Sequence, residues 1–149
     1  MSICLIGRNL TNYVLASILA EKGLNIEIVY ESKKKLIKSS RTLAVTVENF
    51  QFVKNIIKNF KIYKWPIRSI EIYNEKNHEN NFLKFENDKK ISFYLVYYDE
   101  MFRFFEKNCK NNKKIKLNFK KNIVSYLNNK KYNIIINSDT NSIVSKKLF

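Results

Sequence analysis

The sequence predicts an α/β protein with a partly parallel sheet, and three observations support this fold class. Residues 2–6 (SICLI) and 25–30 (NIEIVY) are short apolar or alternating runs that are typical of strands. Between them, apolar residues recur at helical spacing from Leu10 to Leu19, and Gly23 stands where a helix commonly ends. Strand, helix and strand follow one another within about 30 residues, which is the size of a βαβ unit with two parallel strands.

The rest of the chain continues the alternation of strands and helices. Apolar residues at helical spacing predict one helix beginning near Thr46 and another with Asp99 as its N-cap. Strands are predicted at 115–119 and 132–136, which we expect to complete the main sheet, at 67–73, 82–85 and 91–97, which we expect to form a separate small sheet, and at 123–127.

The composition is strongly basic. The 149 residues include 28 Lys and Arg against 13 Asp and Glu, which gives a net charge of +15. Lysine, asparagine and isoleucine are all abundant and share A- and T-rich codons, so a drift in base composition accounts for much of the excess. A nucleic-acid partner would more often favour arginine, with its bidentate fork. The composition therefore argues against nucleic acid and leaves open a polyanion or an anionic membrane surface.

Several classes of site are excluded by residue counts. Cys4 and Cys109 are too few for a disulfide framework, and His78 as the only histidine cannot supply an ordinary zinc site. No apolar run approaches the roughly 18 residues of a membrane span. The first residues carry no basic segment typical of a secretory signal. These features predict a cytoplasmic protein without a metal site.

A candidate anion site follows the first predicted strand. Residues 7–12 (GRNLTN) occupy the frame of the dinucleotide motif G-x-G-x-x-G, with Gly7 in its first position. Asn9 and Asn12 stand in place of the second and third glycines. Glu31 ends the second strand, where an acidic residue binds ribose hydroxyls in such sites. The spacing predicts a nucleotide site, whereas the lost glycines remove room for a pyrophosphate.

Four later segments resemble, in order, the N-terminal half of the FAD-dependent aromatic hydroxylases, in particular those of ubiquinone biosynthesis. They are 41–45 (RTLAV), like the family's R-x-x-A-L; 65–72 (WPIRSIEI), like its I-x-x-I-x-V strand; 93–99 (FYLVYYD), a strand entering a helix; and 136–144 (INSDTNSIV), like its G-A-D-G-x-x-S segment. The resemblance implies a Rossmann-like FAD-binding domain over residues 1–149, with 61–97 as an insertion or the stump of a substrate domain.

The same resemblance implies FAD as the ancestral cofactor. Its binding residues would be Gly7, Asn9, Asn12, Glu31, Arg41 and Asp139, and no catalytic residue is assigned. Four of them have a plain alternative: Gly7 as a strand-to-helix turn, Glu31 as a solvated acid, Arg41 as a surface arginine and Asp139 as a loop acid.

The resemblance also has clear departures. Family members are more than twice as long, and a later G-D motif that contacts FAD does not appear here. A pseudoenzyme, a remnant or the first half of a split protein would all look like this. The partners implied are a missing C-terminal half or other ubiquinone-biosynthesis proteins, with a peripheral contact at the inner membrane face left open. The alternative function is a non-catalytic basic module that binds a polyanion, either nucleic acid or an anionic membrane surface. It would use the lysine-rich residues 107–121 together with Phe119, Tyr126 and Tyr132.

Overall fold

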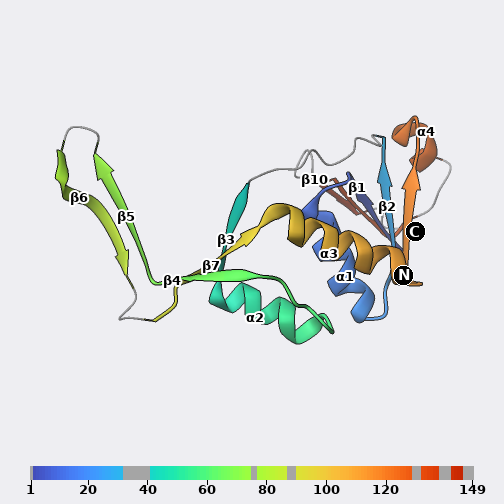
Figure 1. Cartoon of the computed structure of the whole chain (residues 1–149). Helices are drawn as coiled ribbons and strands as arrows, with labels where there is room; N and C mark the ends of the chain where they lie inside the picture. Colours follow the sequence, from blue (N-terminus) through green and yellow to red (C-terminus); the bar gives the residue numbers. More distant parts are fainter. Residues whose placement is uncertain are drawn as a thin grey trace. The chain divides into compact units, whose positions relative to one another are not determined.

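The computed structural model describes residues 2–31, 41–74, 77–86, 90–128, 132–137 and 142–145. The chain divides into two compact units (Figure 1). The first unit joins Met1–Ser39 to Met101–Phe149, and the second is Ser40–Glu100.

The first unit is built on a five-stranded sheet with the order β10-β9-β1-β2-β8. Its strands are β1 (Ser2–Ile6), β2 (Asn25–Tyr30), β8 (Ile115–Phe119), β9 (Ile134–Asn137) and β10 (Ser142–Ser145). The first four are mutually parallel, and β10 runs antiparallel to β9. The α/β class and the parallel main sheet are therefore confirmed, and the added edge strand β10 was not predicted.

Helix α1 (Leu10–Glu21) connects β1 to β2 and ends as the sequence predicts. Gly23 has φ +88°, a left-handed backbone that suits glycine. Its N–H donates to the Ala20 carbonyl (2.9 Å), and the Leu24 N–H donates to the Leu19 carbonyl (3.2 Å). These two bonds form a Schellman motif, which satisfies the last carbonyls of the helix.

The buried face of α1 differs from the predicted apolar stripe. Leu10, Val14 and Ile18 are only partly buried. The fully buried side chains of α1 are Asn12, Tyr13, Ala16, Ser17 and Ala20. Since α1 is apolar around most of its circumference, periodicity alone does not select the face, and small side chains allow the closest approach of the helix to its neighbours.

Helix α3 (Tyr98–Asn111) contributes Met101, Phe105 and Cys109 to the core, as their i, i+4, i+8 spacing predicts, and Phe102 is buried beside them. The Phe102 ring meets Tyr13 of α1 edge to face, with 5.1 Å between ring centroids. Asp99 was predicted to be the N-cap, but α3 already begins at Tyr98, so Asp99 lies in its first turn. In that position its negatively charged carboxylate still interacts favourably with the positive end of the helix dipole.

Residues 123–127 were predicted to form a strand, and this prediction was wrong. They belong to the short helix α4 (Ile123–Asn128). The Asn122 side chain accepts a hydrogen bond from the Ser125 N–H at 2.9 Å, and its carbonyl accepts one from Tyr126 at 3.3 Å. An asparagine cap thus overrides the β-branched residues that suggested a strand.

The second unit holds helix α2 and two small sheets. Helix α2 (Val47–Ile56) begins after Thr46, whose hydroxyl accepts from the Asn49 N–H at 3.2 Å. One sheet has the antiparallel order β3 (Thr42–Thr46), β7 (Phe93–Tyr97) and β4 (Lys64–Ile67), and the other is the hairpin of β5 (Ser69–Asn74) and β6 (Asn77–Glu86).

The single small sheet predicted from 67–73, 82–85 and 91–97 is therefore two sheets. The first run divides at Arg68, because Ile67 ends β4 and Ser69 begins β5. Strand β7 pairs with β4 on one side and with the unpredicted β3 on the other. Both edges of β7 are therefore hydrogen-bonded, and β5 and β6 pair with each other in a separate sheet.

Candidate nucleotide-binding turn

The turn between β1 and α1 has the backbone of a strand-to-helix anion site. Gly7 has φ +109°, a conformation that side-chain-bearing residues rarely adopt. Its N–H donates to the Val29 carbonyl of β2 at 2.9 Å. The turn and the α1 N-terminus therefore lie at the carboxyl edge of two adjacent parallel strands, where ligands of open α/β sheets bind.

Asn9 caps α1 with its own side chain. Its backbone is extended, and its Oδ1 accepts a hydrogen bond from the Asn12 N–H at 2.9 Å. The first N–H groups of a helix have no partner within the helix and are the groups that a phosphate would use. One of these groups is consequently engaged by Asn9.

Asn12 lies fully buried beneath the turn. Its Nδ2 donates to the carbonyls of Ile6 and Gly7, both at 2.8 Å. Among the described residues, its Oδ1 has no hydrogen-bond partner. Where the dinucleotide motif has a third glycine for close packing, this chain has an amide that ties the turn to the helix.

Arg8, inside the motif, is held by α3. Its Nη2 lies 2.6 Å from the Glu106 Oε1, its Nε donates to the Tyr13 hydroxyl at 3.3 Å, and its guanidinium lies 5.9 Å from the Tyr30 ring centroid. Burial raises the pKa of the Glu106 carboxyl, but hydrogen bonds from Arg8 and Lys110 outweigh it, and the net pKa is lowered. Sequence reasoning missed this contact because 98 residues separate the partners.

Glu31 follows β2, as predicted, and is exposed. Its Oε1 accepts a hydrogen bond from the Ile123 N–H at 3.1 Å, at the start of α4. The Gly7 turn is hydrogen-bonded to Val29, two residues before Glu31. The carboxylate therefore belongs to the same edge of the sheet as the turn, with one oxygen engaged by α4.

The contacts described above within the first unit involve neither of the other two predicted site residues. Arg41 belongs to the second unit, where its guanidinium lies 5.4 Å from the Tyr98 ring centroid. Asp139 lies outside the described residues. Their assignment to a cofactor remains a prediction.

Both cysteines are core residues. Cys4 and Cys109 are fully buried and unpaired with each other. Burial raises the pKa of the Cys4 thiol to about 12 and that of Cys109 to about 11, so neither is a reactive thiolate at neutral pH. Within the described part of the chain, no group of three His, Cys, Asp or Glu side chains could hold a metal ion. None of its helices is long and apolar enough to cross a membrane.

Comparison with known proteins finds similar solved structures but no similar sequence. No family model and no curated protein matches the sequence. Among solved structures, the chain is similar to PqsL, a probable FAD-dependent monooxygenase from Pseudomonas aeruginosa, with 10% identity, TM-score 0.56, and 80% of this chain against 32% of PqsL covered. The chain is also similar to 2,6-dihydroxypyridine-3-hydroxylase from Arthrobacter nicotinovorans, with 14% identity and a TM-score of 0.53. That match covers 78% of this chain and 28% of the hydroxylase.

A third similar structure is FqzB, with 8% identity and a TM-score of 0.60 over 80% of this chain and 28% of FqzB. The chain thus spans about a third of the length of these proteins. The likeness supports the predicted resemblance at the level of the fold: this chain has the mixed α/β, Rossmann-like fold found in part of the FAD-dependent monooxygenases.

Proposed function

We propose that this chain binds the adenosine end of FAD, or a related adenine nucleotide, at the Gly7 turn, as a reduced relative of the flavin-dependent monooxygenases. The observation that carries the proposal is the left-handed Gly7 between two parallel strands and the N-terminus of α1. That geometry directs a helix dipole at a ligand. Glu31 at the same edge supplies an acceptor for ribose hydroxyls.

The residues present fit the two ends of an ADP group unequally. Gly7 keeps the backbone of the turn, and Glu31 keeps the acid of the ribose site. At the pyrophosphate position, the Asn9 side chain takes the Asn12 N–H, and Arg8 is paired with Glu106. Two groups that could meet a phosphate are therefore engaged within the protein. This favours weak nucleotide binding, with the ribose contact as its main anchor.

The finer assignment extends this proposal. Bound FAD in a complete monooxygenase supplies the oxidation chemistry, and the protein positions it. No residue of this chain is assigned to hydroxylation, so we propose that the chain alone is inactive and belongs to the ubiquinone-biosynthesis type only by descent. A pseudoenzyme and one half of a split hydroxylase, working with a C-terminal partner, both agree with this proposal.

Calorimetric titration with AMP tests the ribose contact. Glu31→Gln should weaken AMP binding about tenfold, which is about 1.4 kcal/mol, because charge-assisted bonds from the ribose become neutral ones. The glutamine oxygen can still accept from the Ile123 N–H, so the contact with α4 is retained.

The matched control is Glu21→Gln, which removes the same charge from an exposed position at the far end of α1. It should leave AMP binding within twofold of wild type. An equal effect of both substitutions would show that only general charge matters, and an unchanged affinity in Glu31→Gln would remove Glu31 from the site.

A further inference from the structure

One edge of the three-stranded sheet in the second unit has unpaired backbone groups. Strand β3 pairs with β7 on one side only. The Tyr98 N–H donates to the Arg41 carbonyl at 3.0 Å, so these residues form a hydrogen-bonded pair at the start of the antiparallel ladder. Because the direction of the backbone groups alternates along a strand, those of Thr42 and Ala44 point away from β7. Among the described residues, no strand lies on that side of β3.

The side chains along β3 leave this edge accessible. Helix α2 covers one face of the sheet, where the Phe50 ring lies 5.1 Å from the Tyr94 ring of β7 between centroids. Tyr94 is the register partner of Val45, so Val45 is on the face of α2. Side chains alternate between the faces, which places Thr42 and Ala44 on the other face, where both are exposed. A second strand can therefore approach β3 without displacing a large side chain.

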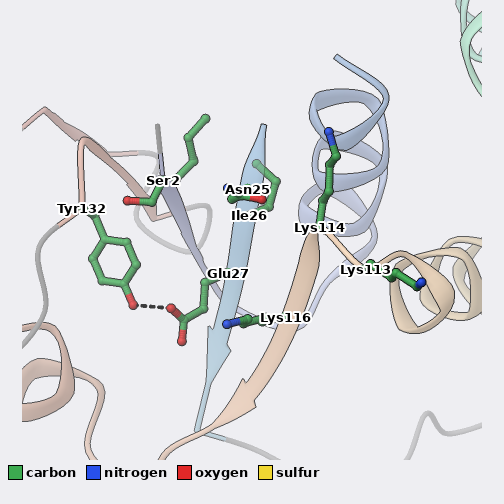
Figure 2. A pocket seen from close by; sticks show the side chains of 9 residues that line it. Ser2, Asn25, Ile26, Glu27, Lys113, Lys114, Lys116 and Tyr132 are labelled. Carbon is green, nitrogen blue, oxygen red and sulfur yellow. Dashed lines mark hydrogen bonds between the residues drawn. The ribbon is translucent and has the colours of Figure 1, made fainter. Parts of the chain in front are cut away.

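The sequence protects other sheet edges but not this one. Exposed edges are commonly protected from pairing by charged side chains or by proline. The β8 edge of the main sheet contains Lys116 and follows Lys113 and Lys114 (Figure 2). Strand β4 contains Lys64 and Pro66, and both strands of the hairpin carry acidic side chains. Strand β3, with the sequence TLAVT, has neither a charge nor a proline.

The distribution of charge favours a second copy of this chain as the partner of β3. The second unit contains 10 Lys and Arg against 8 Asp and Glu, whereas the first unit contains 18 against 5. Contact through the second unit therefore brings together two nearly neutral surfaces, whereas contact through the first would bring together two strongly basic ones. This difference also excludes β10, an uncharged edge strand of the first unit, as the favoured contact.

The charges at the two ends of β3 are complementary in an antiparallel pair. Arg41 directly precedes β3, and Glu48 follows it in the first turn of α2. When two β3 strands run antiparallel, the beginning of one meets the end of the other. Opposite charges of the two copies then come together at both ends of the pair.

We propose that two copies of this chain associate through their β3 strands, antiparallel about a two-fold axis at Ala44. The two Ala44 residues exchange backbone hydrogen bonds, and the Thr46 N–H of each copy donates to the Thr42 carbonyl of the other. The two three-stranded sheets become one continuous sheet with an isologous interface. Since strands of five residues make a contact smaller than the roughly 800 Å² per partner of a standard interface, the dissociation constant is on the order of 10–100 μM.

Sedimentation equilibrium of the full chain tests this association. In about 0.15 M salt, which screens charges more than about 8 Å apart, the average mass should rise from one chain at about 1 μM towards two at about 500 μM. Ala44→Lys and Ala44→Glu each place like charges directly opposite one another, so each variant alone should stay monomeric. The matched control, Ala44→Thr, adds an uncharged side chain suited to strands and should associate within threefold of wild type.

A mixture of the two charged variants is the most specific measurement. Equal amounts of Ala44→Lys and Ala44→Glu should form a dimer, because opposite charges then face each other across the axis. Such rescue requires that both variants are folded and that the two residues at position 44 are neighbours.

Three results would overturn the proposal. They are a wild-type chain that is monomeric at about 500 μM, charged variants that associate individually as wild type does, and a mixture that stays monomeric. Glu31→Gln should associate as wild type, since Glu31 belongs to the first unit. The outcome is therefore independent of nucleotide binding at the Gly7 turn.

Discussion

At the scale of single residues, Asn9 and Asn12 both replace motif glycines but have different structural roles. Asn9 caps a helix at a partly exposed position, whereas Asn12 is buried and donates hydrogen bonds to two backbone carbonyls of the turn. Restoring the two glycines should therefore have opposite consequences, which the sequence motif by itself does not reveal.

Asn9→Gly should strengthen ADP and FAD binding severalfold. The substitution releases the Asn12 N–H for a phosphate and removes a side chain from the approach to the turn. Replacing an asparagine cap by glycine costs only a few tenths of a kcal/mol, so the fold should persist. Flavin fluorescence titration measures the gain. Unchanged affinity would indicate that phosphate does not approach α1.

Asn12→Gly should instead destabilise the protein by about 2–4 kcal/mol. It leaves the carbonyls of Ile6 and Gly7 without their donor, opens a cavity under the turn, and places glycine within a helix. Urea denaturation followed by circular dichroism gives the change in midpoint. A loss no larger than that of Asn9→Gly would mean that water replaces the amide at little cost.

At the scale of elements, the ion pair between Arg8 and Glu106 joins the β1–α1 turn to α3. Because the folded pKa of Glu106 is lower than its ordinary value of 4.5, the pair stabilises the fold at pH above that value. The stabilisation is lost as pH falls through the lower, folded pKa.

Glu106→Gln should therefore flatten the acid limb of the stability curve below about pH 4.5. At neutral pH it should cost about 1.5–3 kcal/mol, the range for a hydrogen bond to a charged group. Thermal melts between neutral and acidic pH measure both effects, with Glu21→Gln as the control. Parallel acid limbs in wild type and Glu106→Gln would contradict the assigned linkage.

The β5–β6 hairpin shows another consequence of pairing between elements. Ile70 lies opposite Phe85 and Ile72 opposite Leu83, so four apolar side chains share one face. They are 36–51% exposed, whereas Lys84 pairs with Glu71 and Glu86 on the other face. The alternation in the sequence predicts a strand with one apolar and one polar face, but only the structure shows that this apolar face is exposed among the described residues.

At the scale of the whole molecule, the net charge of +15 favours non-specific binding of anions, which adds to any specific binding at a nucleotide site. A basic surface attracts polyanions, and this attraction falls steeply with ionic strength. Contacts made at the Gly7 turn act at short range and are screened much less.

We therefore expect salt to separate the two kinds of binding. Raising sodium chloride from about 0.05 M to about 0.5 M should reduce the affinity for a short single-stranded oligonucleotide by about a hundredfold. AMP affinity should fall less than fivefold, as measured by fluorescence anisotropy competition. Equal salt dependence of the two ligands would favour the basic-module alternative over a nucleotide site.

The sequence by itself determined the features that depend on neighbouring residues. Alternation and spacing predict the βαβ unit, the cap at Gly23 and the buried face of α3, because each is fixed by residues a few positions apart. The position of Gly7 in the turn also follows from the local order of strand, glycine and helix. The α4 helix escaped prediction, since a single asparagine cap decided between two weak local tendencies.

Only the tertiary structure decided which distant groups meet. It pairs Arg8 with Glu106, brings Glu31 to the start of α4, and gathers Tyr126 and Tyr132 on Glu27. A partly buried carboxylate must find donors, but the chain offers many, and their choice depends on strand order and on how the helices pack. In the same way, β7 lies between β3 and β4 although it follows both in the sequence. Backbone hydrogen bonds form between any two strands that lie side by side, however far apart they are along the chain.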